Sequence, residues 1–282
     1  MDVVAGVDGL RPEHGPIFAV VGVFDGLHLG HQYLLEHLVR EAKERAARPT
    51  VITFDHHPDA VLVGAAPPLL LHPDERLERL GASGVAVTVV QHFDEAVRHT
   101  TYDAFVDSIR ARTVLAGLLM TPDAAFGFER RGTPETLATL GARDGFNVVV
   151  VPTFTLDGRS VRSSDVRVAI AAGDLTTAAA LLGRPLTIRG DLRGGVLTMP
   201  WPIAMPPDGE YGCTVDGAAA VLTVHAGEAT LTAMDGRGGS RLGDHGGVTA
   251  RLTTVRAARV VRVRRVHGSR NGPSRRGRRT ID

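Results

Sequence analysis

The sequence predicts an α/β protein in which a parallel sheet, covered by helices on both faces, precedes a smaller β domain. Between residues 17 and 154, short apolar runs alternate with segments of helical periodicity, which is the pattern of a parallel sheet. Beyond Pro185 helical periodicity disappears, Thr, Val and Gly dominate, and turn sequences such as PPDG and VDG recur. These two observations separate the chain into an α/β part and a β part.

The elements of the α/β part follow in a regular order. Apolar runs predict strands at 17–24, 49–54, 85–91, 113–120 and 147–154. Helices are predicted after the first strand, from Pro73, around 102–112, over 134–145 and as two short segments within 161–185. Ser163 or Ser164 is the expected N-cap of the first short segment, because serine accepts from free backbone N–H groups there. We expect domains at 1–184 and 185–267 and a disordered, Arg-rich tail at 268–282.

Composition limits the chemistry. No apolar run reaches membrane-spanning length, and the start lacks a basic segment before an apolar core, so we expect a cytoplasmic protein without membrane contact. Cys213 and Lys43 are the only residues of their types, which excludes an intramolecular disulfide, a Cys-based metal site and a G-K-[ST] phosphate loop. From Arg256 onward the chain has ten Arg and one acid. No aromatic residue accompanies them, so a solvated tail is favoured over nucleic-acid binding.

The stretch GVFDGLHLGH carries the clearest chemical signal. It falls where the first strand gives way to a helix, and in an open α/β sheet such a loop faces the binding crevice. Gly26 and Gly30 let the backbone approach a ligand, and the helix N-terminus suits a phosphate. His28 and His31, three residues apart, can donate to the same anion. The alternative is a pair of surface histidines on an ordinary loop.

Three further polar groups, TFDHHP, PDAAFGFERRG and RSSDVR, fall at the same edge of the predicted sheet. In the absence of a phosphate-loop lysine, His28, His31, backbone amides, Arg167 and a magnesium ion would neutralise phosphate. That set suits attack on the α-phosphorus of a nucleoside triphosphate with pyrophosphate leaving, and it requires no covalent nucleophile.

Each group also has a simpler interpretation. TFDHHP can be a strand end with a proline turn, the aromatic rings of FGF can pack a turn, and Arg167 can be a surface residue. Asp55, His56 and His57 could form a metal site, but no further ligand follows at a recognisable spacing.

The motifs GVFDGLHLGHQYLL, ITFDHHP, FGFERRGTPETL and RSSDVRVAIAAGDLTTAAALLGRPL together resemble the bacterial bifunctional riboflavin kinase/FMN adenylyltransferase family, also called FAD synthetase, over about residues 15–190. The resemblance implies a Rossmann-like nucleotidylyltransferase domain followed by a β-barrel. The first domain would join FMN to the AMP part of ATP with magnesium, giving FAD and pyrophosphate. His28, His31 and Arg167 are carried over as catalytic residues, and no residue is assigned as a metal ligand. The substrate-binding residues carried over are Gly22, Phe24, Asp25, Gly26, Gly30, Asp55, His57, Asp123, Ser163 and Ser164.

This chain departs from the family pattern at three places. Arg162 and Ser164 stand where the family has Ser and Thr, and Asp165 adds a negative charge near the expected phosphate site. Thr121 and Ala124 replace a Gly and an aromatic residue in the turn, which we expect to reshape the flavin side of the site. In the second domain the loop is short and the kinase motif P-T-A-N is absent. We therefore predict a degenerate riboflavin kinase domain that lacks phosphotransfer activity and is kept for packing or assembly.

Two other functions stay open at this point. One is a nucleotidylyltransferase with another phosphate-monoester acceptor or with CTP as donor. The other is a non-catalytic protein that binds flavin nucleotides. Self-association is compatible with all of these.

Overall fold

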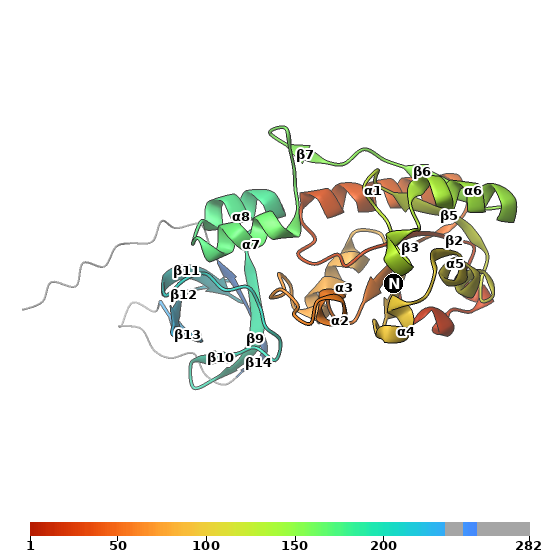
Figure 1. Cartoon of the computed structure of the whole chain (residues 1–282). Helices are drawn as coiled ribbons and strands as arrows, with labels where there is room; N and C mark the ends of the chain where they lie inside the picture. Colours follow the sequence, from red (N-terminus) through yellow and green to blue (C-terminus); the bar gives the residue numbers. More distant parts are fainter. Residues whose placement is uncertain (235–244, 253–282) are drawn as a thin grey trace, which may run out of the picture.

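The computed structural model describes residues 1–234 and 245–252. It places an α/β domain beside a closed β-barrel, as Figure 1 shows. The predicted fold class is therefore confirmed. The expected tail at 268–282 lies outside the described residues.

Six parallel strands form the sheet of the α/β domain. They are β1 (Asp2–Ala5), β2 (Ile17–Val21), β3 (Arg48–Phe54), β4 (Val87–Gln91), β5 (Leu115–Met120) and β6 (Asn147–Val150). Their order in space is β1-β4-β3-β2-β5-β6, and every neighbouring pair is parallel. The chain runs outward from β2 through β3 to β4 and then returns to β5 on the other side of β2. A crevice is expected beyond the carboxyl ends of β2 and β5, where the order reverses.

Helices cover both faces of this sheet. Successive side chains of a strand point to opposite faces. Accordingly, Phe18 and Val20 pack in one cluster with α1 (Leu29–Glu44) and α3 (Pro73–Ala82). Ile17 and Ala19 pack in a second cluster with α5 (Tyr102–Arg110) and α6 (Pro134–Asp144). Among the helices of the described residues, none combines the length and the apolar character needed to cross a bilayer.

Several short elements connect these larger ones. The short helices are η1 (Val7–Gly9), η2 (Pro12–His14), α2 (Asp59–Leu62), α4 (Glu95–Arg98) and η3 (Phe128–Arg130), and β7 (Thr155–Leu156) pairs with β8 (Arg159–Ser160). Two strands end earlier than predicted. The strand expected at 17–24 ends at Val21, because the chain turns through Phe24 with a φ of 53°. The strand expected at 147–154 ends at Val150, and Pro152 two residues later has no N–H to donate.

Two helices join the sheet to the barrel, α7 (Ser163–Ala171) and α8 (Leu175–Leu182). The prediction that Ser163 or Ser164 caps α7 is wrong, because the N-cap is Arg162. Asp165 accepts from the Arg162 N–H at 3.2 Å, while the Ser163 hydroxyl donates to the carbonyl of Asp25 at 3.0 Å. The serine is therefore engaged with the loop after β2 rather than with its own helix.

The barrel consists of antiparallel strands closed in the order β10-β13-β12-β11-β14-β9. They are β9 (Thr187–Arg193), β10 (Val196–Thr198), β11 (Gly209–Val215), β12 (Ala218–His225), β13 (Glu228–Ala233) and β14 (His245–Leu252). The buried residues of α7 and α8 belong to the same apolar cluster as the barrel interior. The boundary at 184 stays a prediction, and the two helices that it assigns to the first domain are packed against the second (Figure 1).

Candidate active site

Two adjoining chambers lie at the carboxyl edge of the sheet. The smaller one, of about 360 Å³, is lined by the loop after β2, the start of α1 and the turn after β5. The larger one, of about 540 Å³, is lined by the ends of β2 and β3, α2, α4 and η3. Val21, Gly22, Ala125 and Phe126 line both. The chambers therefore meet at the reversal of strand order, the position that the fold favours for a ligand.

His28 and His31 lie together in the smaller chamber at the first turn of α1. His28 is the N-cap, and its Nδ1 accepts from the backbone N–H of His31 at 3.4 Å. The two rings stack with centroids 3.8 Å apart. Because Nδ1 of a neutral His28 acts as an acceptor, its proton is placed on Nε2. The cap contact thus leaves His28 with one N–H donor for a ligand.

Burial governs the charge of both rings. It lowers the pKa of His28 to about 4, and the positive charge of Arg184 acts in the same direction. Burial also lowers the pKa of His31 well below its ordinary range. Both imidazoles are therefore neutral near pH 7, and Nδ1 of His31 is buried with no hydrogen-bond partner among the described residues. Such an unpaired polar atom in a chamber wall is expected to be satisfied by a ligand or water.

The loop between β2 and α1 has an unusual backbone path. Phe24 and Leu27 have φ angles of 53° and 41°, and Gly26 has 81°. Left-handed conformations are costly for residues with side chains and concentrate at functional sites. A Cβ at Gly26 would lie 2.7 Å from a methyl carbon of Leu70. Close packing and the turn therefore both require glycine there.

Asp25 anchors this loop from beneath. Its carboxylate is buried and accepts from the Leu70 N–H at 2.9 and 3.1 Å, and Arg167 donates to it at 2.5 Å. Burial raises the pKa of Asp25, while the charge of Arg167 opposes that shift. Arg167 also donates to the Pro68 carbonyl at 2.8 Å. Both charged groups are thus engaged with the protein and line neither chamber.

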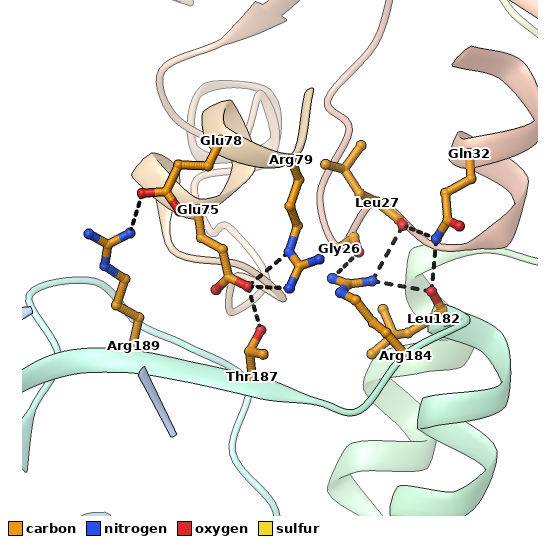
Figure 2. A network of polar contacts seen from close by, with 10 residues as sticks. All are labelled: Gly26, Leu27, Gln32, Glu75, Glu78, Arg79, Leu182, Arg184, Thr187 and Arg189. Atoms are coloured by element: carbon orange, nitrogen blue, oxygen red, sulfur yellow. Dashed lines mark hydrogen bonds and ion pairs between the residues drawn. The ribbon is translucent and has the colours of Figure 1, made fainter. Parts of the chain in front are cut away.

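A second group of contacts fixes the loop carbonyls from the barrel side (Figure 2). Arg184, between α8 and β9, donates to the carbonyl oxygens of Gly26 at 2.7 Å and Leu27 at 3.4 Å. Gln32 of α1 donates to Leu27 at 2.8 Å and to Leu182 at 2.9 Å. The left-handed turn directs these carbonyls outward, and side chains from two other segments satisfy them.

The same interface continues along α3. Glu75 accepts from Arg79 at 2.7 Å and from the Thr187 hydroxyl of β9 at 2.8 Å, and Arg189 of β9 donates to Glu78 at 2.8 Å (Figure 2). The first strand of the barrel is thereby attached to α3 of the α/β domain.

The mouth of the smaller chamber carries a pair of opposite charges. Arg162 and Asp123 both line it, and their side chains approach to 3.8 Å. Asp123 also accepts from Thr121 at 2.9 Å. Thr121 and Ala124, the altered turn positions, line this chamber beside the histidines and do not line the larger one.

The larger chamber is rich in phenylalanine, with charged side chains of α4 and η3 on its border. Phe54, Phe93, Phe126 and Phe128 contribute to its wall, and Phe54 meets Phe93 edge to face with centroids 5.3 Å apart. His57 lines it as well, and its Nδ1 accepts from the Asp59 N–H at 3.2 Å. Flat apolar ligands suit such a cavity.

The structure brings most of the predicted site residues to the chambers. The smaller chamber is lined by Gly22, Phe24, His28, Gly30, His31, Asp123 and Ser163, and the larger one by Gly22 and His57. The others, Asp25, Gly26, Asp55, Ser164 and Arg167, line neither.

Sequence reasoning missed two arginines that hold the loops. One is Arg184, and the other is Arg76 of α3. Arg76 is buried and donates to the carbonyls of Val23 at 3.1 Å and Phe54 at 2.7 Å. A signal was present for Arg76, since it lies one helical turn before the buried Leu80 and thus on the apolar face.

Comparison with known proteins identifies the family. The family model for FAD synthetase matches residues 10–165, which is more than half of the chain. The chain belongs to the FAD synthetase family. The predicted resemblance is therefore confirmed, and the matched region includes the loop after β2 and both histidines of the smaller chamber.

Relatives of this FAD synthetase family member extend the match into the barrel. A bifunctional riboflavin kinase/FMN adenylyltransferase of Pseudomonas fluorescens is 34% identical over 196 residues, covering 69% of this chain and 63% of the relative. The Escherichia coli (strain K12) protein of the same name is 30% identical over 238 residues, covering 82% and 76%. The chain thus spans less than two thirds of the Pseudomonas protein.

A solved structure shares the two-domain fold. The crystal structure described as a macrolide-efflux protein from Streptococcus pneumoniae superposes with a TM-score of 0.76 at 23% identity, covering 89% of this chain and 90% of that one. At this identity the likeness concerns the fold alone.

Proposed function

We propose that this protein is an FMN adenylyltransferase, which transfers AMP from ATP to FMN and releases FAD and pyrophosphate. The observation that carries this proposal is the pair of joined chambers. A chamber with neutral histidines at a helix N-terminus adjoins an aromatic chamber through a shared wall. The relatives are named as FMN adenylyltransferases, and that reaction needs one site for a nucleotide and an adjoining site for a flavin.

The smaller chamber is the proposed nucleotide site. The triphosphate lies at the N-terminus of α1, where free N–H groups and the helix dipole favour an anion. His28 and His31 donate to phosphate oxygens, and Ser163 completes the wall. Magnesium enters as part of the MgATP substrate, with most of its ligands supplied by phosphate and water oxygens. Asp123 is the carboxylate that faces this chamber.

The larger chamber is the proposed flavin site. The isoalloxazine ring lies among Phe54, Phe93 and Phe126, which offer stacking faces and edges. The FMN phosphate then extends past the shared wall at Gly22 toward the nucleotide. A side chain at this glycine would place a Cβ 3.0 Å from the Phe24 ring, so the lack of one lets Phe24 pack directly against the shared wall.

The chemistry is a single displacement. An oxygen of the FMN phosphate forms a bond to the α-phosphorus of ATP, while the bond from that phosphorus to the bridging oxygen breaks and pyrophosphate leaves with the electron pair. Positioning and charge stabilisation account for catalysis of this kind. His28 and His31 stabilise the charge that develops on the phosphates. Arg167 acts through Asp25 as a positioning residue, because its guanidinium contacts the carboxylate beneath the loop.

We also propose that the barrel lacks riboflavin kinase activity. The P-T-A-N motif is absent from the sequence. The segment between β10 and β11 is bonded to the first domain instead, because Leu69 donates to Pro202 at 2.7 Å and accepts from Ala204 at 2.8 Å. Ile203 between them is buried. The backbone that would border a kinase site is thus used in packing.

The test is pyrophosphate release and FAD formation by the purified protein with MgATP and FMN, riboflavin or no acceptor. FMN-dependent release is expected to fall about a hundredfold in His31→Ala and to stay unchanged in His225→Ala, which alters an exposed barrel histidine. Riboflavin is expected to give no ADP. CTP is included as donor, because the altered residues Thr121 and Ala124 line the proposed nucleotide chamber rather than the flavin chamber where they were expected to act. Other phosphate monoesters are included to test the acceptor. Tight FMN binding without pyrophosphate release would refute catalysis.

A further inference from the structure

A cluster of metal-ligating side chains lies outside both chambers. Asp55 and His56 directly follow β3, and His92 directly follows the neighbouring strand β4. The Asp55 carboxylate is 2.6 Å from Nδ1 of His56 through one oxygen and 2.6 Å from Nδ1 of His92 through the other. One ligand atom from each residue lies within 4.8 Å of the others. His92 supplies the ligand that sequence spacing around TFDHHP did not reveal.

We propose that Asp55, His56 and His92 bind a divalent transition-metal ion, with Zn²⁺ as the best match. Two imidazole nitrogens and a carboxylate oxygen form a three-residue set that zinc accepts, with water completing the tetrahedron. Imidazole suits zinc, copper and nickel, whereas magnesium selects oxygen. The cluster is therefore distinct in chemistry from the magnesium that accompanies a nucleotide, and in place, since its residues line neither chamber.

The backbone already holds the ligands in register. The Asp55 N–H donates to the Gln91 carbonyl at 3.1 Å, which aligns the ends of β3 and β4. The His56 N–H donates to the Asp55 carboxylate at 2.9 Å and orients it. A tetrahedral ion with bonds near 2.0 Å keeps its ligand atoms roughly 3.3 Å apart. The two carboxylate–imidazole pairs would therefore open by about 0.7 Å, and no two ligand atoms start more than 4.8 Å apart, so side-chain rotation with the strands in place is enough to form the site.

A metal ion at this cluster would affect the wall of the larger chamber. Phe54 precedes Asp55, and Phe93 follows His92, and these two rings pack edge to face in the wall of the larger chamber. His57 and Pro58, which follow His56, line the same chamber. An ion at the cluster would link the two loops that carry this wall.

The test is metal binding by the full-length protein without a polyhistidine tag, after removal of metal with a chelator. Titration with Zn²⁺ alone is expected to show one tight equivalent by calorimetry, and Co²⁺ is expected to give visible absorption bands of a low-coordinate site. Millimolar Mg²⁺ is not expected to compete. His92→Ala and Asp55→Asn are each expected to weaken Zn²⁺ at least tenfold, since even partners outside the ligand set contribute 10- to 100-fold.

The matched control is His225→Ala. His225 is an exposed histidine whose Nδ1 lies 3.2 Å from an Asp208 oxygen. This surface pair offers one imidazole and one carboxylate, but it lacks the second imidazole of the proposed cluster. This variant is expected to bind Zn²⁺ like the parent protein. The absence of a tight equivalent in the parent, or equal affinity in the parent and both cluster variants, would overturn the proposal. Neither result depends on FMN or ATP, so the proposal stands or fails independently of the adenylyltransferase assignment.

Discussion

Acidification is expected to destabilise the fold through His28. The pKa of this buried ring is lowered to about 4 in the folded chain, whereas an unfolded histidine titrates near 6.5. As the pH falls below 6.5, His28 becomes protonated in the unfolded state but stays neutral in the folded state. The free energy of unfolding therefore decreases, and it continues to decrease until the pH reaches the folded pKa. Linkage gives a loss of about 2 kcal/mol between pH 7 and pH 5 from this group alone.

Urea unfolding of the wild-type protein and His28→Asn at the two pH values measures this contribution. Asparagine keeps an acceptor at the N-cap but does not titrate. The wild-type protein is expected to lose about 2 kcal/mol more than the variant over this interval. His225→Asn, which changes an exposed histidine, is expected to follow the wild type. If His28→Asn and the wild type lose the same amount, burial does not keep His28 neutral and the reasoning fails.

Three substitutions test other parts of the site. Arg184→Met is expected to cost about 2 kcal/mol of folding free energy and to raise the KM for ATP, because it leaves the Gly26 carbonyl without its side-chain donor. As the control, Arg189→Met removes an ion pair with an exposed carboxylate and is expected to cost less than about 1 kcal/mol. Gly26→Ala is expected to destabilise by about 1–3 kcal/mol more than Gly64→Ala in urea unfolding, because both glycines have φ near 80° but only Gly26 has a close neighbour; equal losses would contradict the packing argument. Phe126→Ala is expected to weaken FMN binding about tenfold by calorimetry, because the flavin ring would bury less apolar surface, and to affect ATP less.

Periodicity carried most of the fold prediction. The apolar runs of β2–β5 and the amphipathic pattern of α1 are long enough for their period to be read directly from the sequence. β1 was not predicted, because its Asp2–Ala5 segment has only four residues, and its pairing with β4 is a tertiary contact. The histidine site was predictable for a related reason. His28 and His31 belong to one continuous loop, so local sequence already places them together.

Interactions between distant segments were not predictable. Arg167 was expected at the phosphates, but it lies 142 residues from Asp25 in sequence and is bonded to it in the structure. Arg184 and Gly26 are separated by 158 residues. His92 meets Asp55 only because β3 and β4 are neighbours in register. In each case the partner of a polar side chain depends on strand order and helix docking, which a single sequence does not specify.

The position of Arg184 has a consequence for how this protein can change over generations. The residue lies three positions before β9, the first strand of the barrel, and its guanidinium reaches the loop that begins the nucleotide site. Deleting the barrel would also uncover the apolar side of α7, whose Arg167 contacts Asp25. If the barrel has lost kinase activity as proposed, selection for adenylyl transfer is still sufficient to retain it, because the barrel supports the loop and helix of the adenylyltransferase site. Its sequence is then free to drift wherever it does not contact α3, α7, α8 or the loop.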